Sequence, residues 1–359
     1  MPFADELLSA ATAENLARAL ATAAPRNPLT AVHAAASGLG GLALRARADL
    51  LRDALLADVP GGYRELADVV RTATPHLAGW MVWPVTTAVA ARAVDDGSDE
   101  AFDDAMAILA GLTGLLTAEF AIRTLLRHDL GRALAIALRW AGSDDTDVRR
   151  LASEGTRPYL PWAVRVPGLS AQTIPILDAL YRDPSDYVRR SVANHLNDLS
   201  RDHPELVVTT AARWLEAPDA RTAQVVRHGL RTLVKRGDPG ALALLGYGKA
   251  SVHVDGPTLD ADVVWIGDAI EFRATVRNTG DEAARLAIDY LVYHRKANGS
   301  QTAKTFKLTT ATLQPGEAAE IRRAHSFRVI TTRRYYPGPH AIALQVNGVA
   351  TPMATFELR

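Results

Sequence analysis

The stretch LYRDPSDYVRRSVANHL, residues 180–196, contains the pattern that decides the fold of the longer, N-terminal part of the chain. An apolar helix end leads through an acidic turn with proline into a second helix that opens on Val-Arg. The same order recurs in WAGSDDTDVRRLAS from Trp140 and in WLEAPDARTAQVVRHGL from Trp214. The Val-Arg pairs begin at 148, 188 and 226, so they are 40 and then 38 residues apart. This period is typical of HEAT-type helical hairpins, which stack into a solenoid with a concave surface.

The sequence outward from this repeat divides into two parts with different periodicity. Residues 1–248 are rich in Ala, Leu and Arg, with apolar residues three and four apart, which predicts helices throughout. Residues 252–359 alternate with a period of two between turn signals such as NTGD, ANGS and QPGE. We therefore predict a multidomain chain, α then β: a HEAT-like solenoid, a linker near GYGKASVHVDGP, and an immunoglobulin-like β-sandwich.

The overall composition excludes several classes of protein. Hydrophobic residues make up 48% and charged residues 22%, and the formal net charge is zero, so no whole-molecule field favours nucleic acid or membrane. With no cysteine, disulfides, thiolate zinc sites, iron–sulfur clusters and a cysteine nucleophile are excluded. The longest apolar stretch, 105–118, is too short to span a bilayer. We expect a cytoplasmic protein that uses no metal or other cofactor.

The arginines of the repeats have two interpretations. Arg149 and Arg189 are placed to pair with aspartates of successive hairpins, which would make them architectural. Arg150, Arg190, Arg227 and Arg231 recur on equivalent helices and would form a cationic face for a polyanion. Both interpretations remain open at this point. Asp147 and Asp186 fall near helix starts, where an acidic cap is favoured.

Three motifs carry a family resemblance: TAEFAIR at 117–123, DVRRLASEGTRPYLPWA at 147–163 and DYVRRSVANHLNDLSRDHP at 186–204. They resemble the AlkC branch of HEAT-like-repeat DNA alkylation-repair glycosylases, some of which carry an immunoglobulin-like C-terminal domain. The resemblance implies a monofunctional glycosylase that excises 3-methylcytosine and 3-methyladenine from double-stranded DNA. It also implies that the lesion is not drawn into a deep pocket, unlike in most base-excision enzymes. A monomer suits a solenoid that clasps a duplex.

The resemblance implies catalytic roles for Glu119, Glu154 and Trp162. Glu119 is the only acid in LTGLLTAEFAIRTLL, which we expect to be one long apolar helix; alternatively it pairs with Arg123 at i,i+4. Glu154 lies in the last turn of a predicted helix, where the macrodipole disfavours a carboxylate, and a salt bridge to Arg157 is the alternative to catalysis. Trp162 would bind a cationic base by cation–π attraction or pack on the sugar; alternatively it fills the core beneath a turn.

The predicted DNA contacts are arginines from both parts of the chain. In the helical part they are Arg157, Arg150 and Arg190. The sequence between Tyr290 and Tyr336 contains nine basic residues and only two acidic ones. A DNA interface there would use Arg322, Arg323, Arg333 and Arg334. The alternative is an ordinary solvated sandwich surface. His195 is expected to be a satisfied polar residue at a hairpin interface, without a catalytic role.

Two other functions remain as rivals. A HEAT-repeat scaffold would use its groove for a protein partner, and a DNA-binding family member without activity would only recognise damage. Binding through several phosphates weakens steeply with added salt, which separates DNA binding from the scaffold.

Overall fold

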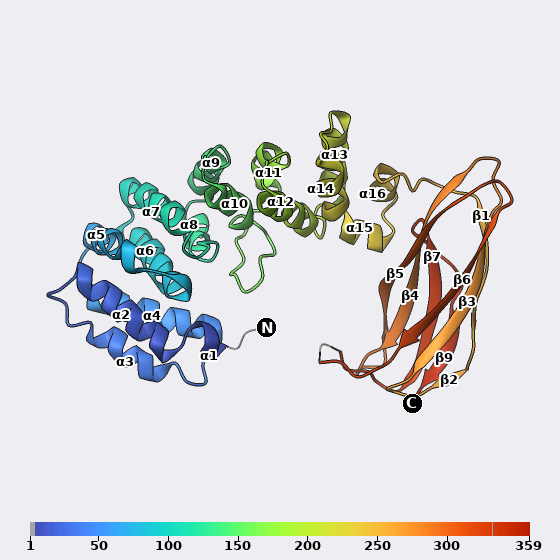
Figure 1. Cartoon of the computed structure of the whole chain (residues 1–359), viewed down its shortest axis with the longest axis horizontal. Helices are drawn as coiled ribbons and strands as arrows, with labels where there is room; N and C mark the ends of the chain where they lie inside the picture. Colours follow the sequence, from blue (N-terminus) through green and yellow to red (C-terminus); the bar gives the residue numbers. More distant parts are fainter. Residues whose placement is uncertain (1–3, 332) are drawn as a thin grey trace. The chain divides into compact units, whose positions relative to one another are not determined.

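The structure of the protein, a computed structural model, describes residues 4–331 and 333–359 (Figure 1). Helices extend to Leu244 and strands begin at Val252, as the change of periodicity predicts. The helices are α1 (Ala4–Leu7), α2 (Ala10–Ala23), α3 (Thr30–Gly38), α4 (Leu44–Asp58), α5 (Tyr63–Ala73), η1 (Thr74–His76), η2 (Gly79–Met81), α6 (Val82–Asp96), α7 (Asp99–Leu112), α8 (Ile122–His128), α9 (Leu130–Trp140), α10 (Thr146–Glu154), η3 (Ala171–Thr173), α11 (Ile174–Leu180), α12 (Asp186–Leu199), α13 (Pro204–Glu216), α14 (Thr222–Gly229), α15 (Arg231–Arg236) and α16 (Pro239–Leu244). None of these helices is long and apolar enough to cross a membrane.

The chain forms two compact units. One contains the residues up to His203 together with 218–229, and the other contains 204–217 and 230–359. The second unit therefore includes α13, α15 and α16 besides the strands. The predicted limits 1–248 and 252–359 describe the change from helix to strand, and as domain boundaries they remain a prediction.

Two of the three predicted helical hairpins and the second helix of the third are present in the first unit. Helix α9 packs on α10 and α11 on α12, while α10 packs on α12 and α12 on α14 (Figure 1). Arg149 of α10 donates from Nε to Asp183 Oδ2 at 2.6 Å, in the turn of the next hairpin. The architectural interpretation is therefore confirmed for Arg149. Arg189 instead donates to the carbonyls of Asp183 and Pro184, in the turn of its own hairpin.

The helix starts are capped one or two residues earlier than the aspartates that the sequence singles out. Asp145 caps α10 by accepting a hydrogen bond from the Asp147 amide at 2.8 Å. Ser185 is the N-cap of α12, and Asp186 is its first residue. The carboxylates of Asp147 and Asp186 still lie in the first turn, where they interact favourably with the positive end of the helix dipole.

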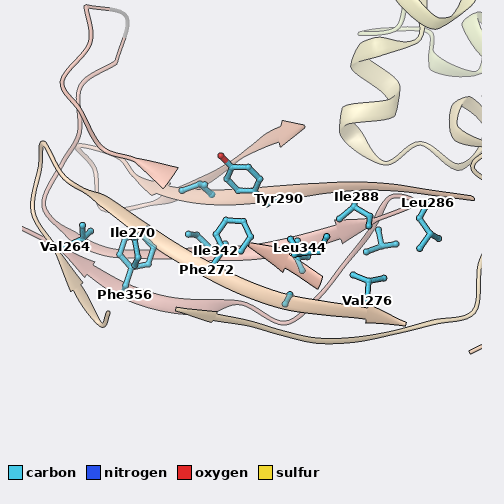
Figure 2. Packing of buried hydrophobic residues seen from close by; sticks show 14 of the residues in the cluster. Val264, Ile270, Phe272, Val276, Leu286, Ile288, Tyr290, Ile342, Leu344 and Phe356 are labelled. Atoms are coloured by element: carbon cyan, nitrogen blue, oxygen red, sulfur yellow. The ribbon is translucent and has the colours of Figure 1, made fainter. Parts of the chain in front are cut away.

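The strands form the predicted immunoglobulin-like sandwich. The strands are β1 (Val252–Leu259), β2 (Val263–Val264), β3 (Ala269–Asn278), β4 (Ala284–Arg295), β5 (Gln301–Leu313), β6 (Ala318–Ser326), β7 (Gly338–Val346), β8 (Val349–Ala350) and β9 (Ala354–Leu358). One sheet has the order β1-β3-β6 and the other β2-β9-β7-β4-β5, with β8 paired to β7. In β3 every second residue is buried, which places Ile270, Phe272 and Val276 in the core with Tyr290 of β4 (Figure 2). The Phe272 and Tyr290 rings lie 5.1 Å apart, between the two sheets.

Candidate functional site

Glu119 lies in a turn and not in the long helix that the sequence predicts. Helix α7 ends at Leu112 and α8 begins at Ile122. The Thr113 hydroxyl accepts a hydrogen bond from the Ala118 amide at 3.3 Å, which closes the intervening turn and competes with helix continuation. The predicted helix is therefore wrong between the two, and the turn places the Glu119 side chain in a largely buried position, 9% exposed.

An aromatic stack holds the turn that contains Glu119 against helix α6. Phe120 stacks on Trp83 of α6, with ring centroids 4.3 Å apart. Trp83 is itself buried in the helical core. The residue after Glu119 is therefore fixed to the scaffold, which limits the movement of the carboxylate.

The Glu119 carboxylate is bound on one side only. Oε2 accepts hydrogen bonds from Thr117 Oγ1 at 2.9 Å and Arg150 Nη1 at 3.1 Å. No described residue donates a hydrogen bond to Oε1. This oxygen is also not buried without a partner, so it is accessible. Burial raises the pKa of Glu119 most, Arg150 opposes that rise, and the Glu154 charge adds to it. Glu119 thus offers an open acceptor oxygen with increased basicity.

Arg123 does not form the i,i+4 ion pair considered for Glu119. It is buried and donates to the carbonyl oxygens of Gly155 (3.2 Å), Arg157 (2.9 Å) and Val164 (2.5 Å). Burial lowers the pKa of Arg123 to about 10. The Arg123 side chain therefore holds the segment that follows α10, and Glu119 pairs with Arg150 instead.

Glu154 is the last residue of α10, as predicted, and both its oxygens are engaged. Oε1 accepts from Arg157 Nη1 at 2.5 Å, and Oε2 accepts from Ser191 Oγ at 2.6 Å. The predicted alternative, a salt bridge to Arg157, is therefore present. Gly155 is required directly afterwards, because an added Cβ would lie 2.9 Å from both the Leu151 oxygen and Ile122 Cγ2.

Arg157 joins two buried carboxylates. Its Nε donates to Asp198 Oδ2 at 2.9 Å, in addition to the bond from Nη1 to Glu154. Burial by itself would lower the pKa of Arg157, but Glu154 and Asp198 outweigh it and the pKa is raised. A phosphate would have to displace these carboxylates. The position therefore does not fit the phosphate contact that the sequence predicts for Arg157.

Arg150 contacts Glu119 and Glu154, and little of its side chain is exposed to solvent. Besides Glu119, its Nη2 lies 3.7 Å from Glu154 Oε1. The Tyr187 ring covers its guanidinium, with Cζ 4.7 Å from the ring centroid, and Tyr187 is 43% exposed. Sequence reasoning missed Tyr187 and Ser191, whose only signal is their place one residue before and two residues after the Val-Arg pair of the repeat.

His195 occupies the hairpin interface, as predicted. It is fully buried, with Nε2 3.0 Å from Thr173 Oγ1 and Nδ1 2.9 Å from the Ser153 carbonyl oxygen. Burial lowers the pKa of His195 to about 3. The ring is therefore neutral and fully used in packing.

Trp162 lies in the segment between α10 and η3, which extends away from the helices in Figure 1. Its side chain is 57% exposed, so the alternative of a core tryptophan is wrong. The residue has φ of 63°, a left-handed conformation that is uncommon outside glycine, and its carbonyl accepts from Arg45 Nη1 at 3.0 Å. Non-glycine residues held in this strained conformation cluster at functional sites.

The remaining predicted arginines are Arg190 of α12 and four arginines of the second compact unit. Arg190 is exposed and pairs with Asp186 at 3.1 Å. Arg322 is exposed and pairs with Glu271 at 2.7 Å, whereas Arg333 is partly buried and donates to His294 Nε2 at 3.1 Å. Arg323 and Arg334 are exposed. These four belong to the second compact unit.

The site offers acid–base and electrostatic chemistry. Among residues 4–331 and 333–359, no group of three His, Cys, Asp or Glu side chains could hold a metal ion. What the first unit brings together is two guanidiniums, Arg150 and Arg157, among the carboxylates of Glu119, Glu154 and Asp198.

Known proteins resemble this chain over its whole length. Residues 253–359 match the family described as the C-terminal Ig-like domain of the uncharacterised protein YhaZ. The chain is 33% identical over 321 residues to the uncharacterized protein YhaZ of Bacillus subtilis (strain 168), which is 88% of each chain. It is 36% identical, with a TM-score of 0.87 and full coverage of both chains, to the Pseudomonas fluorescens alkylpurine DNA glycosylase AlkC bound to DNA containing an abasic site analog.

Proposed function

This chain belongs to the AlkC-type family of helical-repeat DNA glycosylases with a C-terminal immunoglobulin-like domain, and on that premise we propose that it excises 3-methylcytosine and 3-methyladenine from duplex DNA. Such a base carries a positive charge through its N3 methyl group and is therefore already a good leaving group. As the C1′–N bond breaks, positive charge develops on the sugar. A fixed carboxylate close to the sugar stabilises that charge, and a positioned water completes the hydrolysis.

The unequal binding of the two carboxylates supports this proposal. Glu154 has both oxygens engaged, whereas Glu119 leaves Oε1 open. Glu119 would orient and deprotonate the attacking water, and Glu154 would supply fixed negative charge. An open, fixed carboxylate beside a fully bound one suits the stabilisation of a transient cation.

Trp162 and the exposed arginines would bind the DNA. The exposed indole of Trp162 would cover the cationic base or the sugar from a surface segment, which accords with excision without a deep pocket. Arg190, Arg322, Arg323 and Arg334 would contact phosphates, with Arg333 as a neighbouring cation. We infer a monomer bound to one duplex, located in the cytoplasm, that works without a cofactor.

Base release from a duplex oligonucleotide with a single 3-methylcytosine tests the proposal. Alkali cleavage of the abasic product would be measured for the wild type, Glu119→Gln and Glu154→Gln. We expect release by the wild type and a loss of 100-fold or more for Glu119→Gln, a typical cost of removing a general base. Release that is unaffected in both variants would overturn the site.

The same assay separates the rival functions. No release from either alkylated cytosine or adenine would favour a scaffold or a damage-binding protein. Steep weakening of binding with added salt would then favour the damage-binding protein over the scaffold.

A further inference from the structure

Arg150 has an arrangement that the proposed chemistry does not explain. Its guanidinium lies 3.1 Å from Glu119 Oε2 and 3.7 Å from Glu154 Oε1, so one cation bridges both carboxylates. The side chain is only 16% exposed, which leaves little of it for a phosphate. Its position between the carboxylates therefore argues against the phosphate contact that the sequence predicts for Arg150.

The side chains that form the ion pairs of this cluster carry one negative charge in excess, and the nearby Arg123 guanidinium donates to backbone carbonyls instead. Glu119, Glu154 and Asp198 are three carboxylates, and Arg150 and Arg157 are two guanidiniums, so the sum is −3 + 2 = −1. Arg157 forms ion pairs with both Glu154 and Asp198, so Arg150 is the cation that pairs with Glu119. A single positive charge, such as that of an alkylated base or a developing sugar cation, would be attracted to the open Oε1 of Glu119.

Tyr187 fixes Arg150 from the solvent side. The guanidinium lies over its ring at 4.7 Å, and cation–π attraction is strongest where the cation is partly desolvated. Thr117 also holds the guanidinium, because its Oγ1 accepts a hydrogen bond from Arg150 Nη1 at 3.2 Å. Arg150 is therefore held by residues from the Glu119 turn, α10 and α12 together.

We propose that Arg150 is a positioning residue that bridges Glu119 and Glu154, that Tyr187 holds it there, and that the bridge keeps both carboxylates ionised for a cationic substrate. A neutral base brings no charge to the remaining negative site, so the cluster favours alkylated over undamaged bases. This inference rests on the proposed function. It adds Arg150 and Tyr187 as residues that set charge and specificity.

The pH dependence of base release tests the bridge. The charged and titratable groups around Glu119 are Arg150 and Glu154 on α10, Arg123 on α8 and Tyr187 on α12. In Arg150→Gln, two neighbouring carboxylates lose their common cation, and one takes up a proton more readily. We expect the acidic limb of the rate profile to move up by about one pH unit or more, and Arg150→Lys to restore part of the shift.

Tyr187 and a surface arginine supply the controls. Tyr187→Leu removes the ring and should move the acidic limb in the same direction by less, while Tyr187→Phe keeps the ring and should remain closer to the wild type. Arg132→Gln removes an exposed guanidinium that also joins two carboxylates, Asp99 and Asp103, outside the site. Its profile should stay with that of the wild type.

A measurement without substrate keeps this inference separate from the proposed function. Carbon-13 titration of the glutamate side-chain carboxyls, with Glu119 assigned from Glu119→Gln, should show a higher midpoint for Glu119 in Arg150→Gln than in the wild type. If the wild type releases no base but this shift appears, the proposed function fails and the bridge stands. An unchanged midpoint and an unchanged acidic limb, or a DNA-binding salt slope reduced by about one in Arg150→Gln, would overturn the bridge.

Discussion

Removal of Arg157 should destabilise the helical unit far more than removal of an exposed arginine. Arg157→Met leaves the Glu154 and Asp198 carboxylates without their shared cation, and their side chains are only 8% and 4% exposed. Breaking a buried pair by removing one partner costs about 3–5 kcal/mol, because an unpaired charge remains in a poorly solvated place. The matched variant Arg190→Met removes an exposed pair, which contributes about 0–1 kcal/mol.

Hydrogen exchange of the α10 and α12 amides is the appropriate assay, because the chain has two compact units and global unfolding need not be two-state. We expect the free energy of opening of these helices to fall by about 3 kcal/mol or more in Arg157→Met and by less than about 1 kcal/mol in Arg190→Met. The salt slope of DNA binding should be unchanged in Arg157→Met. Near-native protection combined with a slope reduced by about one would refute the internal role and restore Arg157 as a phosphate contact.

Three further predictions concern neighbouring residues. Burial lowers the pKa of His195 to about 3 from 6.5, so between these pH values the unfolded chain binds more protons than the folded chain. The stability contributed by neutral His195 is therefore fully present above pH 6.5 and falls on acidification, by about 2 kcal/mol at pH 5. A pH series of unfolding measurements would show this decline, and His195→Asn should flatten it. Gly155→Ala should cost about 1–3 kcal/mol in the exchange of α10, since the new Cβ meets Ile122 and the Leu151 oxygen; protection equal to wild type would contradict the close contact. Because Trp162 is exposed, Trp162→Ala should change the free energy of unfolding by less than about 0.5 kcal/mol. Base release should nevertheless slow by about 5- to 30-fold. An unfolded or fully active variant would remove Trp162 from the site.

Periodicity was sufficient to predict much of this protein. The 40- and 38-residue spacing predicts stacked helical hairpins, because each hairpin can bury its apolar face only against a neighbour. The alternation after residue 252 likewise predicts strands with one buried face, and β3 has that pattern. The end of α10 follows from the Gly155 after Glu154, and the salt bridge to Arg157 follows from a separation of only three residues, which the turn after the helix closes.

Tertiary structure alone decided which charges meet. The sequence offers Arg123 as a partner of Glu119, but the chain turns between α7 and α8, and Arg150 of α10 pairs with Glu119 instead. The sequence pairs Arg157 with Glu154 at most, whereas α12 supplies a second carboxylate, Asp198, 41 residues away. A residue pattern fixes local periodicity because neighbours along a helix or strand have set positions. Pairings across hairpins depend on how whole elements pack, and the cost of burying an unpaired charge then selects among them.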